Sequence, residues 1–256
     1  AMFRDEARAL ACLSHRNVVR LLDSGSDRGE LFLVLELVDG ASLDECLQLG
    51  PLGLDASAEV CRQLCDALAH VHGVCDARAR PLRLFHRDVK PQNMLVMLDG
   101  TMKLSDFGIA SFAPRRATTE QGQVKGTLRY IAPEQIRSGY HDARVDLHAA
   151  GLVWFECVYG RPFFDGSTDA EVTRQVTSRR RDDLPLGHLP VVRSIFELAS
   201  AIDPRARATS AAEVRAALSK VGDSATGRRA LVERVAAVRT LRAARELRAN
   251  EPTRPG

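Results

Sequence analysis

The chain has 256 residues, of which 45% are hydrophobic and 27% charged, so it has the composition of an ordinary globular protein with one substantial core. A formal net charge of +3 is too small to favour nucleic acid as a partner, and no apolar run approaches the roughly 18–20 residues that span a bilayer. Residues 1–5 lack the basic-then-apolar pattern of a signal peptide, so the cytoplasm is the expected compartment.

The first forty residues predict one helix and two strands. A helix is expected over residues 2–13, where apolar side chains recur at helical spacing with charges between them. Residues 18–22 and 31–38 are rich in Leu and Val and predict short strands. The stretch between them, residues 24–29, contains Ser, Asp and Gly and predicts a turn.

From Ser42 onward helical patterns dominate, around a polar middle at 86–142 that is expected to be rich in loops. Cys61 and Cys65 lie four residues apart on one of these helical patterns, which favours small core residues over redox or zinc ligands. The predicted helices cover residues 42–49, 55–72, 143–159, 168–178, 190–201 and 210–219.

The last part of the chain, residues 223–256, is rich in arginine. Within it Leu231, Val235, Val238 and Leu241 form an apolar stripe at helical spacing. We expect an amphipathic helix that packs back on the larger, helical part of the chain or on a partner, with its arginines in solvent. An alternative is a basic segment beside the membrane in a longer, receptor-like protein.

The polar middle carries the residues with recognisable chemistry. Residues 86–93 have the sequence HRDVKPQN, and a DFG triplet begins thirteen residues after Asn93. Phosphoryl transfer from ATP requires a proton acceptor, oxygen ligands for a metal ion and positive charge near the transferred group. The carboxylates of Asp88 and Asp106, the amide of Asn93 and the ammonium of Lys90 are groups of these kinds.

These motifs, followed by the triplet APE at 132–134, resemble the eukaryotic-type protein kinase family in its bacterial branch, over about residues 6–220. The resemblance implies an α+β bilobal fold with a mainly α-helical large lobe and an incomplete β small lobe. The expected division is a partial small lobe at 1–38, a large lobe at 39–222 and an arginine-rich helix or tail at 223–256. The implied activity is transfer of the γ-phosphate of Mg-ATP to Ser or Thr hydroxyls of protein substrates, with autophosphorylation as one outcome.

The resemblance also implies roles for individual residues. Asp88 matches the carboxylate that orients the substrate hydroxyl and accepts its proton, and Asn93 and Asp106 match the Mg²⁺ ligands. Lys90 matches the residue that contacts the γ-phosphate, which favours Ser or Thr as acceptor. Thr127 matches the threonine that bridges Asp88 and Lys90.

On the nucleotide side, residues 31–38 resemble the fifth strand and the hinge of a kinase. Backbone groups of Glu36 and Val38 are expected to meet the adenine edge, with Leu35 as the gatekeeper residue. Ser42 occupies the position of a ribose contact, and Leu95 that of the apolar side chain beneath adenine.

Glu6 lies nine residues before His15, a spacing that matches the glutamate of the regulatory helix in kinases, although a solvated helix carboxylate is the alternative. The lysine that pairs with this glutamate, and the glycine-rich loop, have no counterpart in the sequence. We therefore expect a chain that begins inside the small lobe. A second hypothesis follows, a kinase-like interaction module with impaired catalysis.

The segment after the DFG triplet matches the activation segment in place and length. A phosphate on Thr118 or Thr119 would pair with Arg87, which directly precedes the catalytic-loop aspartate. The alternative is a polar loop without modification.

Three further residues match scaffold positions of the family. Asp146 matches the buried helix aspartate that holds the backbone of the catalytic loop. Arg207 matches the arginine that pairs with the carboxylate of Glu134.

Overall fold

The structure is a computed structural model of the 256-residue chain. It describes residues 10–28, 30–76, 78–107, 127–139, 142–178 and 190–249.

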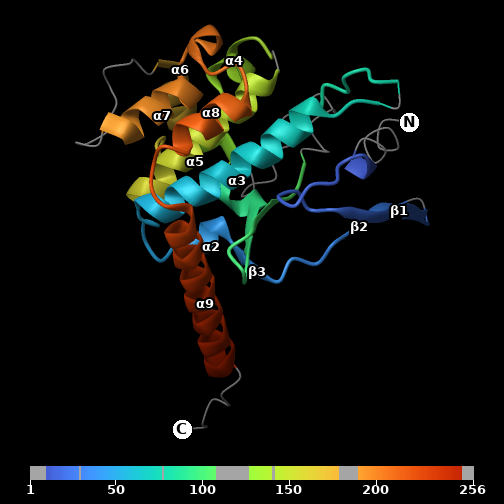
Figure 1. The fold of residues 1–256 in the computed structure, drawn as a ribbon, viewed down its shortest axis with the longest axis vertical. Helices are drawn as coiled ribbons and strands as arrows, with labels where there is room; N and C mark the ends of the chain where they lie inside the picture. The colour runs from blue at the N-terminus through green and yellow to red at the C-terminus, as the bar shows by residue number, and fades with distance from the viewer. Residues whose placement is uncertain are drawn as a thin grey trace.

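Long helices form the centre of the molecule. Helix α3 (Leu54–Gly73) packs against α5 (Ala143–Tyr159), and α7 (Pro190–Ser200) and α8 (Ala211–Leu218) cover these two helices from the outside (Figure 1). Helix α5 is apolar on nearly all sides, which is typical of a helix surrounded by protein, and thirteen of its residues are buried. The helices predicted at 55–72, 143–159, 190–201 and 210–219 are confirmed.

Shorter helical elements accompany the long helices α3, α5, α7 and α8. The predicted helices at 42–49 and 168–178 are confirmed as α2 (Leu43–Leu47) and α6 (Asp169–Ser178). Ser42 begins α2 with a capping box, in which its hydroxyl accepts from the N–H of Glu45 and the Glu45 carboxylate accepts from the N–H of Ser42. The other short helical elements among the described residues are α4 (Pro133–Arg137) and the 3₁₀ helices η1 (Pro91–Asn93), η3 (Thr127–Tyr130) and η5 (Pro204–Ala206).

A three-stranded antiparallel sheet lies beside α3. Strand β4 (Met94–Met97) is its centre, flanked by β3 (Gly40–Ser42) and β5 (Met102–Leu104). Ser42 and Lys103 are both register partners of Leu95, so β3 and β5 flank β4 at this residue. The middle of the chain, which was expected to be rich in loops, therefore also contains two strands, β4 and β5.

A separate two-stranded ribbon precedes this sheet, formed by β1 (Leu21–Asp27) and β2 (Glu30–Leu35). The prediction of a turn over residues 24–29 is wrong, because Ser24 to Asp27 pair with β2 and the chain reverses only after Asp27. The first strand also begins later than predicted, at Leu21.

The residues before β1 attach to the large sheet. Val18 forms an isolated parallel bridge with Leu104, the N–H of Val19 donates to the Leu104 carbonyl at 2.9 Å, and the N–H of Leu104 donates to the Asn17 carbonyl at 2.9 Å. Of the helix predicted over 2–13, Leu10 and Ala11 are helical and residues 1–9 lie outside the described residues.

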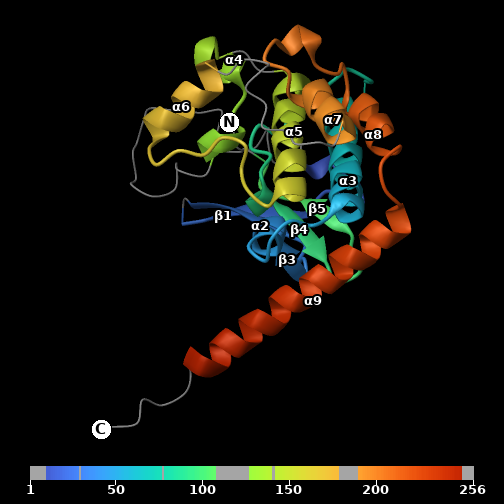
Figure 2. The same ribbon diagram turned by 90° about the vertical axis from the view of Figure 1, so that its left-hand side faces the viewer.

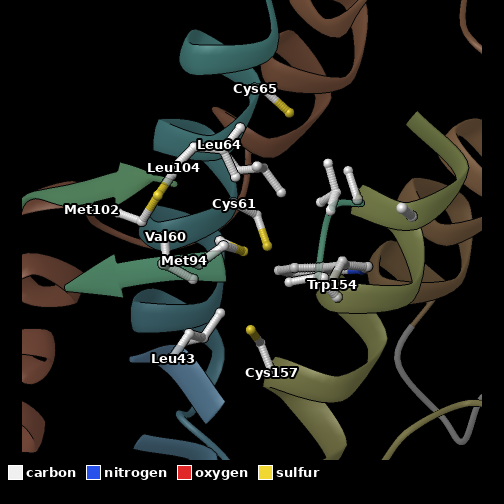
Figure 3. Close-up of a cluster of buried hydrophobic side chains, with 14 of the residues drawn as sticks. Leu43, Val60, Cys61, Leu64, Cys65, Met94, Met102, Leu104, Trp154 and Cys157 are labelled. Atoms are coloured by element: carbon white, nitrogen blue, oxygen red, sulfur yellow. The ribbon is translucent and has the colours of Figure 1, made fainter. Parts of the chain in front are cut away.

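The hydrophobic core lies between α3, α5 and the sheet (Figure 3). Trp154 is fully enclosed there, and its indole N–H donates to the Val192 carbonyl at 3.1 Å. Cys61 and Cys65 are buried in the same core, which confirms their prediction as core residues. Burial raises the pKa of the nearby Cys46 thiol to about 11, so this side chain is unreactive at neutral pH.

Helix α9 (Ser224–Ala249) forms the predicted amphipathic helix and packs against α3. Leu231, Val235 and Val238 are buried, but the predicted stripe ends there, because Leu241 is 44% exposed. The expectation that the arginines are solvated is wrong for Arg234, whose guanidinium donates to three backbone carbonyls, those of Cys46, Gly50 and Pro51. Within the described ranges, no helix is both long and apolar enough to cross a membrane.

Candidate active site

The loop at residues 86–93 is held in place by a carboxylate from α5. The Asp146 carboxylate accepts hydrogen bonds from the backbone N–H of His86 at 2.8 Å and from that of Arg87 at 2.7 Å. Arg87 has a φ of +67°, a left-handed conformation that a non-glycine residue adopts at a cost, and the two hydrogen bonds to Asp146 fix it. The scaffold role expected for Asp146 therefore has a geometric basis.

Asp146 is also bonded to a second side chain. Oδ2 lies 2.8 Å from Nε2 of His72, near the end of α3, and the carboxylate is 1% exposed. Burial alone would raise the pKa of Asp146, but the hydrogen bond and charge of His72 and the hydrogen bond from the N–H of Arg87 outweigh it and lower the pKa below its ordinary value. Asp146 is therefore ionised in the folded protein at neutral pH.

Asp88 lies at the centre of a small polar cluster. Its Oδ2 is 2.7 Å from Nζ of Lys90 and 3.1 Å from Nδ2 of Asn93. The same Asn93 amide donates to the Asp88 carbonyl at 2.9 Å. The Asp88 carboxylate is about a quarter exposed, so it is fixed by neighbours and still reachable by an incoming hydroxyl group.

The segment with Asp106 runs alongside this cluster. The backbone N–H of Ser105 donates to the Asn93 carbonyl at 2.8 Å, and the Ser105 hydroxyl lies 3.1 Å from the Asp106 carboxylate. Asp106 has a φ of +54°, a second left-handed residue in the site. The structure thus brings together the predicted residues Asp88, Lys90, Asn93 and Asp106.

A buried histidine connects the two segments. Nε2 of His86 is 2.9 Å from the Ser105 carbonyl, and its ring lies 4.7 Å from that of Phe107. Burial lowers the pKa of His86, so its ring is neutral at neutral pH. His86 therefore connects the loop at 86–93 to Ser105 by a hydrogen bond and to Phe107 of the DFG triplet by ring packing.

The predicted pair of Glu134 and Arg207 is present. Nη1 of Arg207 lies 2.5 Å from Oε1 of Glu134, and Nη2 lies 2.9 Å from Oε2, which is the bidentate arrangement. The guanidinium also donates to the carbonyl of Arg144 at 3.1 Å, at the start of α5. The pair thereby connects α4, η5 and α5.

The residues predicted to contact the nucleotide line the path from β2 to α2. The backbone N–H of Glu36 donates to the Arg20 carbonyl at 2.9 Å. The Glu36 carbonyl is therefore the backbone group of this residue that we expect to meet a ligand. Its side chain pairs with Lys103 at 2.7 Å. Burial opposes ionisation of Glu36, but the hydrogen bonds from Lys103 and from the N–H of Arg20 lower its pKa.

The other residues of this group lie nearby. Leu35 ends β2 and is 39% exposed, and Val38 is half-buried on the following segment. Leu95 on β4 is the register partner of Ser42. The Ser42 hydroxyl lies 2.9 Å from Oε2 of Glu45 in the capping box, so a ribose hydroxyl would share it with Glu45.

Several predicted residues fall outside what the structure describes. Glu6, Thr118 and Thr119 lie outside the described residues, and their roles stay predictions. Thr127 belongs to η3, but its side chain is not among those described.

Comparison with known protein families identifies the family to which this site belongs. The protein kinase domain family matches residues 1–213. The chain belongs to the protein kinase family. The solved kinase structure of Rad53 1–466 in complex with AMP-PNP superimposes with a TM-score of 0.66 at 27% identity, covering 84% of this chain and 53% of that one. The predicted kinase-like α+β fold is confirmed.

Two curated relatives of this kinase chain come from bacteria. Serine/threonine-protein kinase PknL of Mycobacterium tuberculosis is 38% identical over 174 residues, which cover 68% of this chain and 42% of the relative. Serine/threonine-protein kinase PknB of Mycobacterium leprae is 34% identical over 232 residues, covering 86% of this chain and 35% of the relative. The chain spans less than half the length of these relatives.

Some residues that shape the kinase site were not predicted from sequence. His72 hydrogen-bonds to Asp146, and Ser105 to Asp106, from positions that carry no motif, and Lys103 pairs with Glu36. Lys103 and Leu95 are register partners on neighbouring strands, a relation that becomes visible only once β4 and β5 are recognised as strands.

Replacing Asp146 with Asn should destabilise the kinase domain. The amide would offer one acceptor oxygen where the carboxylate offers two, and each buried donor left unpaired costs about 1–3 kcal/mol. We expect a decrease of that size in the free energy of unfolding at pH 7, measured by urea titration. Because the folded pKa of Asp146 lies below the ordinary 3.8, its contribution is present above that pH and is lost as the pH falls through the folded pKa.

The matched control is Asp142→Asn, at the N-cap of the same helix. Asp142 accepts the N–H of Arg144 at 2.8 Å, and Asn caps helices as well as Asp, so little change is expected. Equal stabilities of the two variants at pH 7 would contradict the supporting role of Asp146.

Proposed function

We propose that this chain is a serine/threonine protein kinase domain, which transfers the γ-phosphate of ATP to Ser or Thr hydroxyls of proteins. The observation that carries the proposal is the cluster around Asp88. The Asp88 carboxylate, about a quarter exposed, lies 2.7 Å from an ammonium group and 3.1 Å from an amide, and the segment that carries Asp106 hydrogen-bonds to Asn93. The serine/threonine kinases among the relatives support the same activity.

In this proposal Asp88 accepts the proton of the substrate hydroxyl as that oxygen attacks the γ-phosphorus. Lys90, held at 2.7 Å from Asp88, places a positive charge where the transferred phosphoryl group gains negative charge. Thr127 would complete this arrangement by bridging the two side chains. The charge and the position of these groups, fixed before substrate arrives, provide the rate enhancement.

The oxygen donors fit a hard divalent cation. Because Nδ2 of Asn93 donates to Asp88, its Oδ1 faces away from Asp88, and the adjacent Asp106 provides a carboxylate. Asn93 and Asp106 would hold Mg²⁺, which neutralises the phosphates of bound ATP. The backbone of Glu36 and Val38 would hold adenine, with the side chain of Leu95 beneath it.

Two further residues complete the proposal. Ser42 would contact the ribose in competition with Glu45, and Glu6 would be the glutamate of the regulatory helix, whose partner in kinases is a lysine of the third strand. Because ATP is the phosphate donor, we place the activity in the cytoplasm.

Regulation by phosphorylation is part of the proposal. Arg87 is fixed by Asp146 next to Asp88, so a phosphate on Thr118 or Thr119 that pairs with Arg87 would connect the activation segment to the catalytic carboxylate. Transfer of phosphate to this segment by another copy of the chain would then be an activating step.

The experiment is a transfer assay with γ-labelled ATP, Mg²⁺ and a peptide mixture of equal Ser, Thr and Tyr content. We expect label on Ser and Thr, little on Tyr, and no transfer when EDTA removes the cation. Mapping of the labelled chain should find Thr118 or Thr119. Calorimetric titration with Mg-ATP accompanies the assay: binding without transfer would favour the interaction module, and the absence of both would contradict the kinase assignment.

A further inference from the structure

Helix α9 lies beyond the part of the chain that the kinase family matches, yet it contacts the elements that frame the nucleotide site. It runs along α3 and then passes α2, β3 and β4 (Figure 2). Its buried residues Leu231, Val235 and Val238 face these elements. Helix α9 is therefore packed on the kinase domain and passes close to β3.

The first half of α9 is anchored far from the hinge. The backbone of Gly227 approaches α3 so closely that a Cβ would lie 2.3 Å from the Asp55 carbonyl, which only glycine permits. Glu59 of α3 accepts from the Ser224 hydroxyl and, at 3.3 Å, from Nη2 of Arg228. Burial of Glu59 opposes its ionisation, but the hydrogen bonds from Ser224 and Arg62 lower its pKa, so the anchor is charged at neutral pH.

The second half of α9 reaches the hinge segment, which we define as residues 36–42. Nη1 of Arg239 lies 2.7 Å from Oδ1 of Asp39. Nη1 of Arg242 donates to the Gly40 carbonyl at 3.2 Å, and its guanidinium binds both carboxylate oxygens of Glu45, with Nε at 2.8 Å from Oε1. Two arginines one helical turn apart thus hold one short segment.

Through Glu45, Arg242 is connected to Ser42, one of the predicted nucleotide contacts. Glu45 holds the N–H of Ser42 at 2.9 Å, and Ser42 is the register partner of Leu95. The Arg242 hydrogen bond is the main reason that the pKa of Glu45 is lowered. Because the Glu45 carboxylate stays charged, it retains its hydrogen bonds from the Arg242 guanidinium and from the N–H of Ser42.

The hinge segment has little freedom where these contacts hold it. A Cβ at Gly40 would lie 2.0 Å from the Val96 carbonyl, so β3 and β4 approach closely at this point. A displacement of Asp39 and Gly40 by α9 therefore cannot be absorbed by β3 alone and would move the segment that includes Val38.

We infer that Arg239 and Arg242 are positioning residues for nucleotide binding, and that α9 is a functional part of the ATP site. They hold the hinge segment in the position that its backbone needs to meet adenine. This inference rests on the proposed function, since it takes the hinge segment as the adenine-binding part of the chain.

The test compares the full chain with the variant Arg239→Glu/Arg242→Glu. Two exposed ion pairs are lost and replaced by like charges, so we expect the dissociation constant of Mg-ATP to rise about threefold to tenfold by calorimetry. The KM for ATP should rise in parallel, while kcat at saturating ATP stays within about twofold, because the groups around Asp88 are untouched. Amide hydrogen exchange in residues 36–42 should become faster.

Two controls make the result specific. Arg245→Glu/Arg248→Glu makes the same charge change on exposed residues of the same helix and should leave the dissociation constant unchanged. Asp39→Arg/Arg239→Asp exchanges the charges of one pair and should restore part of the affinity that Arg239→Asp alone removes.

The outcomes separate the two proposals. If the unmodified chain does not bind Mg-ATP, the proposed function fails. If it binds and the Arg239→Glu/Arg242→Glu variant binds equally well, the inference about α9 is overturned. A variant that only melts at a lower temperature, with unchanged affinity and unchanged exchange at the hinge, would show a purely structural brace and would also overturn it.

Discussion

Replacing Asp88 with Asn is expected to abolish measurable phosphoryl transfer while leaving the fold intact. Asn has the same shape and preserves the backbone contact from Asn93, but it cannot accept the substrate proton. General-base catalysis contributes about 10²–10⁴-fold to a rate, and the ion pair with Lys90 that orients the cluster is lost as well. The initial rate of label transfer to a Ser/Thr peptide is the measurement.

The variant must first be shown to be folded and to bind ATP. Its melting temperature should lie within a few degrees of the unmodified chain, because Asp88 is partly exposed and its ion pair with Lys90 contributes about 0–1 kcal/mol. Asp169→Asn, at an exposed residue in the first turn of α6, is the matched control and should retain full activity. A folded Asp88→Asn protein that keeps more than a tenth of the rate would show that another group accepts the proton.

The helices could be predicted from sequence because their signal is local. Residues 143–159 form a helix with the predicted ends, where Asp142 caps the N-terminus and Gly160, at a φ of +67°, ends it. The apolar stripe of α9 was equally clear up to Val238. In each case spacing and end residues within the segment decide the structure.

The strands could not be predicted as well because their partners are distant in sequence. Strands β3, β4 and β5 have three or four residues each, too few for an alternating pattern, and they form through pairing between Gly40–Ser42 and Met94–Met97. Ser24 to Asp27 have turn-forming composition but lie opposite β2, whose pairing overrides their local preference.

The candidate site shows the same division. The polar residues of the motifs were predicted, and the structure places Asp88, Lys90 and Asn93 within one cluster, with Asp106 on the segment that hydrogen-bonds to Asn93. The contacts around this cluster were not predicted, since His72 binds Asp146 from the end of α3 and Arg242 binds Glu45 from α9. The apolar stripe of α9 did carry a signal, because Arg234, Arg239 and Arg242 flank it, which is the position of side chains that meet the edge of a packed surface.

Replacing Arg207 with Met should cause the largest loss of stability. Its guanidinium is fully buried and bonded to both oxygens of Glu134, to the Arg144 carbonyl and, through Nε at 2.6 Å, to the Ala201 carbonyl. Removing one partner of a buried ion pair leaves the other charge uncompensated, at a cost of about 3–5 kcal/mol. Urea unfolding followed by the fluorescence of Trp154, the single tryptophan, measures the effect.

Two variants show whether the effect belongs to the ion pair. Arg205→Met removes an exposed arginine two residues away and should change the free energy of unfolding by less than about 0.5 kcal/mol. In Glu134→Gln/Arg207→Met no charge is left buried, so the double variant should be less destabilised than the sum of the two single changes. Additive losses would mean that Arg207 acts through its carbonyl contacts alone.

The position of this pair connects stability with catalysis. Arg207 binds the carbonyl of Arg144, two residues before Asp146, and Asp146 holds the backbone of His86 and Arg87 next to Asp88. Loss of Arg207 therefore releases the start of α5, on which the catalytic loop depends. We expect Arg207→Lys, which keeps the charge but not the planar fork, to fold and to have a lower kcat than the unmodified chain, with a smaller change in KM for ATP. If Arg207→Lys changes stability but not kcat, the first turn of α5 holds the catalytic loop without help from the ion pair.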